Sequence, residues 1–303
     1  MGKGKPVSLV LGSGGARGLA HIGVIDWLVE HNFEIRSIAG SSMGALIGGI
    51  YAAGELDTYR HWVKALDKSD VLGLLDLSFG SGGLFKGEKV IERLRDLIGA
   101  RSIEELPIAF TAVATDVEQQ KEVWINKGSL FDAIRASIAV PLVFTPFRRE
   151  GRRLLDGGLL NPLPIAPTLT DTTDLTIAVN LGGRPEESLF PLEEAVAPHE
   201  TIPVSAEEEQ DYSDRIKAFV RELQGRFTQK DEEDWDFFDI MAMSIDAMQN
   251  TITRMKLAAY NPDVTVTICR DAARAYEFYR AAELIELGYQ QTDAVLGPLV
   301  RKE

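Results

Sequence analysis

The stretch IAGSSMGALIGG (Ile38–Gly49) places a serine between two glycines, directly after a short apolar run. Strand-forming residues give way here to small residues that suit a helix, so the stretch predicts a sharp strand-to-helix turn at Ser42. Gly40 and Gly44 would let neighbouring backbone approach a strained serine closely. Free N–H groups at the helix start favour developing negative charge, which makes Ser42 a candidate nucleophile. A glycine-rich turn without chemistry is the alternative, and Ser41 is predicted to cap the helix.

Apolar, strand-like runs alternate with helical patterns along the chain, which predicts a layered α/β fold around a largely parallel sheet. The strand-like runs lie at Val7–Leu11, Ser37–Ala39, Ile108–Ala114, Val123–Ile125, Leu154–Leu155, Leu175–Asn180 and Val264–Ile268. The helical patterns lie at Leu19–Glu30, Met43–Ala53, Thr58–Leu66, Gly87–Ile98, Leu130–Ile138, Trp235–Ala259 and Ala275–Leu287. We expect one domain over residues 1–303, interrupted by an acidic, proline-bearing excursion at about 182–234, because the elements after the excursion still need a sheet to join.

The charge of the chain is negative and unevenly distributed. With 32 basic and 46 acidic residues, the net charge of −14 argues against a nucleic-acid-binding protein, which would need a basic face. The segment Glu186–Asp239 alone carries 17 acidic and 5 basic side chains. This segment would repel anionic lipid headgroups, so any transient contact with a membrane surface is expected elsewhere on the protein.

Cysteine and histidine usage limits the classes of site that the chain can hold. The single cysteine, Cys269, cannot form an internal disulfide and is expected to be a buried thiol in a cytoplasmic protein. The four histidines do not combine with it at metal-ligand spacings, so no metal or other cofactor is expected. The apolar run near the N-terminus is too short for a signal peptide and is predicted to be the first strand.

The segment LVLGSGGARG (Leu9–Gly18) ends this first strand in a glycine-rich loop. A dinucleotide-binding loop would need glycine where Arg17 stands, and the ending of a phosphate-binding P-loop is absent. Successive glycine N–H groups can instead form an anion-binding nest, and we assign Gly14 and Gly15 to such an oxyanion hole. Arg17 is expected to support the loop or to form a structural salt bridge.

A nucleophilic serine needs a base, and none of the histidines stands in a good position for this role. His21 is the nearest to the glycine loop, and only His199, inside the acidic excursion, follows the candidate acid in the chain order Ser, Asp, His. The sequence RRLLDGGLL offers Asp156 at the end of an apolar run, followed by Gly157 and Gly158. Asp-Gly-Gly is also common in turns, so Asp156 alone would not indicate a catalytic role.

Taken in order, GSGGARG, GSSMG and DGG resemble the three signature motifs of patatin-like phospholipases. The linking text from Ala136 to Ile165 and the tail NPDVTVTICRDAARAYEFYRAAELIELG are also similar to bacterial members, so the resemblance covers nearly the whole chain. One departure is that the first motif of the family usually has three consecutive glycines, and Ser13 replaces the first of them here.

The resemblance implies a three-layer α/β/α fold and a serine acyl hydrolase that acts on phospholipids or related lipid esters. It implies a Ser-Asp dyad in which Asp156 accepts the proton of Ser42, with the N–H groups of Gly14 and Gly15 as the oxyanion hole. Gly40, Gly44 and Gly157 would support these loops. No metal is needed in this mechanism, because the donors already stand in place.

Three other interpretations stay open from the sequence. One is a Ser-Asp-His hydrolase that uses His199 or His21, another is a non-catalytic regulatory or scaffold protein on the same fold, and the weakest is a nucleotide-binding module. Trp235, Phe237 and Phe238, which follow an acidic run, are a candidate lid over the site. The oligomeric state is not predicted.

Overall fold

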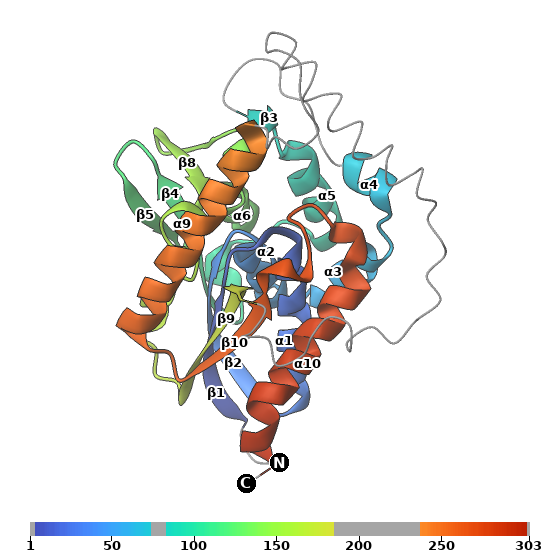
Figure 1. Ribbon diagram of the computed structural model, residues 1–303, viewed down its shortest axis with the longest axis vertical. Coiled ribbons are helices and arrows are strands. Elements are labelled where there is room, and N and C mark those ends of the chain that lie inside the picture. Colours follow the sequence, from blue (N-terminus) through green and yellow to red (C-terminus); the bar gives the residue numbers. More distant parts are fainter. Residues whose placement is uncertain (1–3, 74–82, 185–236, 302–303) are drawn as a thin grey trace. The chain divides into compact units, whose positions relative to one another are not determined.

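The computed structural model of the protein describes residues 4–73, 83–184 and 237–301 (Figure 1). The chain forms two compact units, residues 1–195 with 247–303 and residues 196–246. The sheet belongs to the first unit. His199, Trp235 and most of the predicted acidic excursion lie outside the described residues.

The described strands form one large sheet in the order β10-β9-β1-β2-β4-β8-β7, with β5 paired to β4. Five neighbouring strands run parallel, and β5, β7 and β8 add antiparallel pairs beyond them. The strands are β1 (Lys5–Leu11), β2 (Phe33–Ser41), β4 (Ala109–Asp116), β5 (Lys121–Ile125), β7 (Phe147–Arg149), β8 (Arg152–Asp156), β9 (Leu175–Gly183) and β10 (Val264–Cys269). A separate parallel pair joins β3 (Gly83–Phe85) to β6 (Leu142–Phe144). The prediction of a largely parallel sheet is confirmed.

Helices cover both faces of this sheet. They are α1 (Ala20–Glu30), α2 (Met43–Ala52), α3 (Leu56–Lys64), α4 (Lys68–Gly73), α5 (Glu88–Ile98), α6 (Leu130–Ser137), α9 (Phe237–Tyr260) and α10 (Ala281–Val300). Leu9 and Leu11 of β1 enter a large core with α1, α2 and α10, whereas Val10 enters a smaller core that Leu257 and Tyr260 of α9 border. This alternation follows from the two-residue period of a strand and gives the expected three-layer α/β/α fold. No helix in the described parts of the chain is long and apolar enough to cross a membrane.

The helices α1 and α10 lie side by side, as Figure 1 shows, and two glycines bring their backbones close together. A β-carbon on Gly23 would lie 2.6 Å from the backbone nitrogen of Tyr289, and one on Gly288 would lie 2.9 Å from the Cα of Ala20. Both distances are too short for a real side chain. Glycine is therefore required at these crossing points, and the long final helix is fixed against the helix that follows the glycine loop.

The predicted boundaries of the last helix were wrong at both ends, because α10 begins at Ala281 and continues to Val300. At the start, the carbonyl of Ala275 accepts a 2.9 Å hydrogen bond from the N–H of Ala16, so this residue serves the glycine loop instead of a helix. At the end, the helix continues past the predicted Leu287, and Gly288 lies inside α10 as a contact with α1. Cys269 is a buried free thiol, as predicted.

Candidate active site

Ser42 lies between β2 and α2 with φ 55° and ψ −123°, a backbone conformation that residues other than glycine rarely adopt. Holding a serine there costs about 1–3 kcal/mol, and the surroundings must supply this energy. The carbonyl of Ser42 accepts hydrogen bonds from the N–H groups of Ala45 and Leu46, at 2.9 and 3.1 Å. The predicted strand-to-helix turn is present, and its serine is strained and almost fully buried.

Ser137, which was not predicted from the sequence, binds the backbone of this turn through its hydroxyl. The N–H of Ser42 donates to the hydroxyl of Ser137 at 2.9 Å, and this hydroxyl donates to the carbonyl of Val113 at 2.6 Å. All three groups are buried. Ser137 at the end of α6 therefore links the serine turn to β4 and satisfies a backbone N–H that the turn leaves free.

Ser41 does not cap the helix, contrary to the prediction. It is the last residue of β2, and Ser42 occupies the position before α2 without a side-chain capping bond. The buried hydroxyl of Ser41 has no hydrogen-bond partner among the described residues. It instead faces the third motif, because a β-carbon on Gly157 would lie 2.6 Å from it.

The glycine loop packs directly against the serine turn. A β-carbon on Gly44 would lie 2.9 Å from the carbonyl oxygen of Gly12, and one on Gly40 would lie 2.5 Å from the backbone nitrogen of Ala45. Both glycines that flank Ser42 are therefore needed for close backbone approach, which is the supporting role that the sequence predicted for them.

Two backbone N–H groups of the glycine loop remain available for a ligand. The N–H groups of Ser13 and Ala16 donate to the carbonyls of Pro162 and Ala275, at 2.8 and 2.9 Å. Between them, the N–H groups of Gly14 and Gly15 donate to no acceptor among the described residues. Two adjacent free amides can form an anion-binding nest of the predicted kind.

Two further residues of this loop, Arg17 and Ser13, affect its conformation. The Nε of Arg17 donates to the carbonyl of Gly14 at 3.0 Å, and its Nη1 donates to the carbonyl of Arg270 at 2.7 Å, so Arg17 orients the loop. Ser13, which stands where the family usually has glycine, has a negative φ. Replacing glycine by serine at this position therefore adds no backbone strain.

Asp156 is the last residue of β8, and the register of β4 fixes its place beside Ser42. Ser41 pairs with Val113 of β4, and Asp156 pairs with the next residue, Ala114. Because β5 occupies the opposite side of β4 at these positions, β2 and β8 lie on the same side of β4 and their last residues meet end to end. One step along a strand is about 3.3 Å, so the serine turn and the aspartate lie at adjacent levels.

The turn that follows Asp156 lies against the other two motifs. The N–H of Gly158 donates to Oδ1 of Asp156 at 2.7 Å. A β-carbon on Gly158 would lie 2.6 Å from the hydroxyl of Ser13 in the glycine loop, and Gly157 lies against Ser41 as described above. Three loops from distant parts of the sequence therefore meet at one place.

Burial dominates the electrostatics of Asp156 and raises its pKa to about 7. The nearby Ser42 side chain and the Gly158 N–H lower the pKa, but by less than desolvation raises it. The contact with the Ser42 hydroxyl is looser than a well-formed hydrogen bond, and Oδ2 of Asp156 has no partner among the described residues. Catalytic hydrogen bonds are often long in ligand-free structures and shorten when substrate binds.

His21 serves the glycine loop. Its Nε2 lies 2.9 Å from the carbonyl oxygen of Gly12, and since a carbonyl only accepts, Nε2 carries the hydrogen. Complete burial lowers the pKa of His21 to about 4, so the ring is neutral at neutral pH. The nitrogen that donates to Gly12 is not free to accept a proton from a serine. His199, the other candidate, lies outside the described residues.

Comparison with known proteins agrees with this arrangement of motifs. The family model of patatin-like phospholipases matches residues 9–169, which is more than half of the chain. The chain belongs to the patatin-like phospholipase family. Family membership supports lipid hydrolase activity.

Relatives within this family include bacterial and fungal proteins. Uncharacterized NTE family proteins of Mycobacterium bovis and Mycobacterium tuberculosis are each 39% identical over 319 residues, which cover 93% of this chain and 89% of the relative. Lysophospholipase nte1 of Emericella nidulans is 32% identical over 184 residues, which cover 59% of this chain and 12% of that protein. The crystal structure of VipD from Legionella pneumophila covers 98% of this chain and 67% of its own, with a TM-score of 0.45 and 15% identity.

The strained backbone of Ser42 predicts an unusual order of stability. Ser42→Gly and Ser42→Ala both remove the hydroxyl, but only glycine adopts a positive φ without strain. We expect the glycine variant to be more stable than the alanine variant by about 1 kcal/mol in urea unfolding. In the exposed helical position Ala258, Ala→Gly should instead cost about 1 kcal/mol. An alanine variant at position 42 as stable as the glycine variant would contradict the strained turn.

The raised pKa of Asp156 predicts that this carboxyl destabilises the fold as pH rises. Below the unfolded pKa of about 3.8 the group is protonated in both states, and between there and about 7 only the unfolded state releases the proton, so wild-type stability falls over this window. Asp156→Asn keeps an acceptor for Gly158 but cannot ionise. We expect the variant to gain on wild type on the order of a few kcal/mol between pH 4 and pH 8, in urea unfolding.

When Asp156→Asn and wild type are compared at the same pH, the contributions of other titratable groups to the free energy of unfolding cancel. His21 is one such group, present in both proteins. Its lowered pKa makes stability increase with pH, because its contribution is fully present above pH 6.5 and is lost as pH falls through about 4. A difference between variant and wild type that stays constant with pH would show that the Asp156 pKa is not raised by folding.

Proposed function

We propose that this protein is a serine lipid acyl hydrolase that cleaves ester-linked fatty acids from phospholipids or related lipids. The observation that carries this proposal is the meeting of a strained serine with the carboxyl of Asp156, which is buried and has an unpartnered oxygen, beside two free amides. The resemblance to a family of phospholipases and to a fungal protein named as a lysophospholipase supports the choice of lipid esters.

In the first half of the proposed reaction, ionised Asp156 accepts the hydroxyl proton of Ser42 while the serine oxygen attacks the ester carbonyl. The N–H groups of Gly14 and Gly15 donate to the resulting oxyanion, and a donor of this kind typically contributes about 2.7–4 kcal/mol to the transition state. Collapse of the intermediate expels the alcohol, which takes the proton from Asp156 and leaves an acyl group on Ser42.

In the second half, Asp156 takes a proton from water, which attacks the acyl-enzyme through the same oxyanion hole. The serine leaves with that proton, and the fatty acid is released. A carboxyl with a pKa near 7 suits this role, because it is a stronger base than an exposed aspartate and is still ionised in part at neutral pH.

The remaining expectations from the sequence belong to this proposal. The whole chain would act as one catalytic domain, interrupted by the acidic excursion. Since β9 extends through Gly183, the excursion would begin two residues later than predicted. The protein would work in the cytoplasm and make transient contact with the membrane surface that holds its substrate. The candidate lid would be tested by hydrogen exchange with lipid micelles, since its side chains lie outside the described residues.

The proposal is tested by labelling with a fluorophosphonate and by hydrolysis of lysophosphatidylcholine. Wild type should be labelled, Ser42→Ala should lose labelling and turnover, and Asp156→Asn should reduce both rates by roughly 10²–10⁴ without unfolding. The matched control is Ser41→Ala, which removes the adjacent buried hydroxyl and should keep the label on residue 42. A folded wild type that takes no label and cleaves no ester would favour a scaffold role on the same fold.

Ser137 provides a second test, because its only route to the reaction is through the backbone of Ser42. Ser137→Ala should cost about 1–3 kcal/mol of stability and slow the labelling of Ser42 at least tenfold. The control is Ser8→Ala, which removes another buried serine, bonded to Asp171 and Thr173. It should also destabilise the protein, but the labelling rate should not change. Equal labelling rates in both variants would exclude a positioning role for Ser137.

A further inference from the structure

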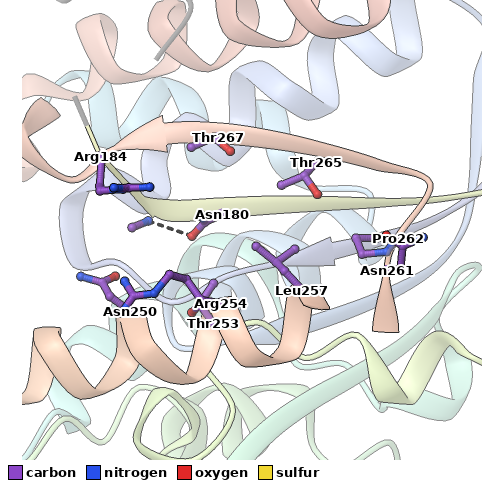
Figure 2. Close-up of a pocket in the computed structure, with 11 residues that line it drawn as sticks. Asn180, Arg184, Asn250, Thr253, Arg254, Leu257, Asn261, Pro262, Thr265 and Thr267 are labelled. Carbon is purple, nitrogen blue, oxygen red and sulfur yellow. Dashed lines mark hydrogen bonds between the residues drawn. The ribbon is translucent and has the colours of Figure 1, made fainter. Parts of the chain in front are cut away.

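A cavity separate from the three motifs lies between α9 and the strands β9 and β10 (Figure 2). Its volume of about 310 Å³ suits a small molecule or one group of a larger molecule. Eight of its eleven lining residues are polar or charged, namely two arginines, three asparagines and three threonines, and Leu257 and Pro262 add apolar surface. Walls of this composition favour a polar ligand over an acyl chain.

The charge of the walls is opposite to that of the chain. The protein has a net charge of −14, yet none of the described residues that line this cavity carries a carboxylate. Both arginines, Arg184 and Arg254, are permanently charged, and the planar fork of a guanidinium matches the oxygens of a phosphate. Arg254 donates to the hydroxyl of Thr251 at 3.0 Å and forms no ion pair with any described residue. Its charge is therefore left for an anion.

The residues that line the cavity are distributed between its two ends. In Figure 2, Arg184, Arg254 and Asn250 lie toward one end of the cavity, and Asn261 and Pro262 lie toward the other. Both arginines therefore line the same part of the cavity.

The amide of Asn180 faces the same space from the sheet (Figure 2). Its Oδ1 accepts a 3.0 Å hydrogen bond from the N–H of Gly182, so its NH₂ group remains to donate to a ligand. Thr265 and Thr267 of β10 contribute hydroxyls from the next strand. The positions of these donors follow from the period of two in a strand, because Asn180 and Gly182 share one face of β9.

A glycine makes room for a further polar side chain. A β-carbon on Gly182 would overlap with the amide oxygen of Asn250, so only glycine lets this side chain of α9 lie against the strand. The cavity is thus built from fitted elements of the fold and does not depend on an exposed loop.

We propose that this cavity binds a phosphate-type oxyanion, held by the guanidinium groups of Arg254 and Arg184 and by the NH₂ group of Asn180. Two sources share this chemistry, a free phosphate and the phosphate of a lipid headgroup. Leu181 and Gln249 do not line the cavity but are next in sequence to residues that do, and both reach the candidate active site: a β-carbon on Gly14 would lie 2.7 Å from Cβ of Leu181, and one on Gly158 would lie 2.8 Å from Nε2 of Gln249. Binding of the anion itself does not depend on the proposed hydrolase activity.

The test is calorimetric titration of the full chain with inorganic phosphate, at constant ionic strength and without lipid. Wild type should bind one phosphate saturably, and Arg254→Gln should weaken binding at least tenfold, which corresponds to about 1.4 kcal/mol. The matched control is Arg93→Gln, which removes the same charge from an exposed position of α5, a helix that contributes no residue to the cavity walls, and should bind like wild type. Thr267→Val, which keeps the shape of the side chain, should weaken binding by a smaller factor.

Hydrolysis then distinguishes the two sources. If the site holds the headgroup phosphate, Arg254→Gln should raise the KM for lysophosphatidylcholine about tenfold and leave the KM for an uncharged ester of the same acyl chain unchanged. If the site holds free phosphate, both KM values should stay the same while phosphate binding is lost. No saturable binding by wild type, or equal affinities in wild type, Arg254→Gln and Arg93→Gln, would overturn the proposal, even in an active hydrolase.

Discussion

The register of β4 is the constraint on which the candidate site depends. β2 runs parallel to β4 and ends opposite Val113, while β8 arrives from the opposite direction and ends opposite Ala114. The two strands share one side of β4, so their ends cannot pass each other and the residues there must meet. A shift of one residue in the pairing of β8 with β4 would turn Asp156 to the other face of the sheet. The hydrogen bonds of a central strand thus fix a contact between residues more than a hundred positions apart.

Strain at Ser42 requires close support from the surrounding structure. A serine with positive φ persists only where neighbours over-determine it. Here Gly44 lets the turn approach the glycine loop, Gly40 lets β2 approach the start of α2, and Ser137 accepts a hydrogen bond from the N–H that the turn leaves free. The strain and its supports come from four different elements, so the geometry of the hydroxyl is a property of the assembled fold.

Local sequence patterns predicted the parts of the site that local chemistry determines. Gly14 and Ser42 lie just after the end of a strand and Asp156 is the last residue of one, each beside glycines, so their positions could be predicted from the local pattern. Ser137 could not be predicted, because its role arises from contact with an N–H group 95 residues away, and a serine at a helix end has no distinctive pattern.

The predictions failed where tertiary contacts override local patterns. The short strands β3, β6 and β7 have three residues each, too few to show a period of two. Gly288 signals a helix end locally, but close packing against α1 keeps it inside α10. The polar cavity combines residues of β9, α9 and β10 that are apart in sequence, so no single segment shows it.

A single buried carboxyl also explains how the proposed reaction manages charge without a histidine. When the proton moves from Ser42 to ionised Asp156, the negative charge moves from the carboxylate to the substrate oxyanion. The net charge of the site therefore stays at −1. A neutral imidazole would instead create a cation and an anion together in a poorly solvated place. Burial raises the pKa of Asp156, which makes the carboxylate a stronger base, and the free amides of Gly14 and Gly15 are suited to receive the charge that it transfers. The same desolvation that destabilises the ionised fold therefore favours the proton transfer that begins the reaction.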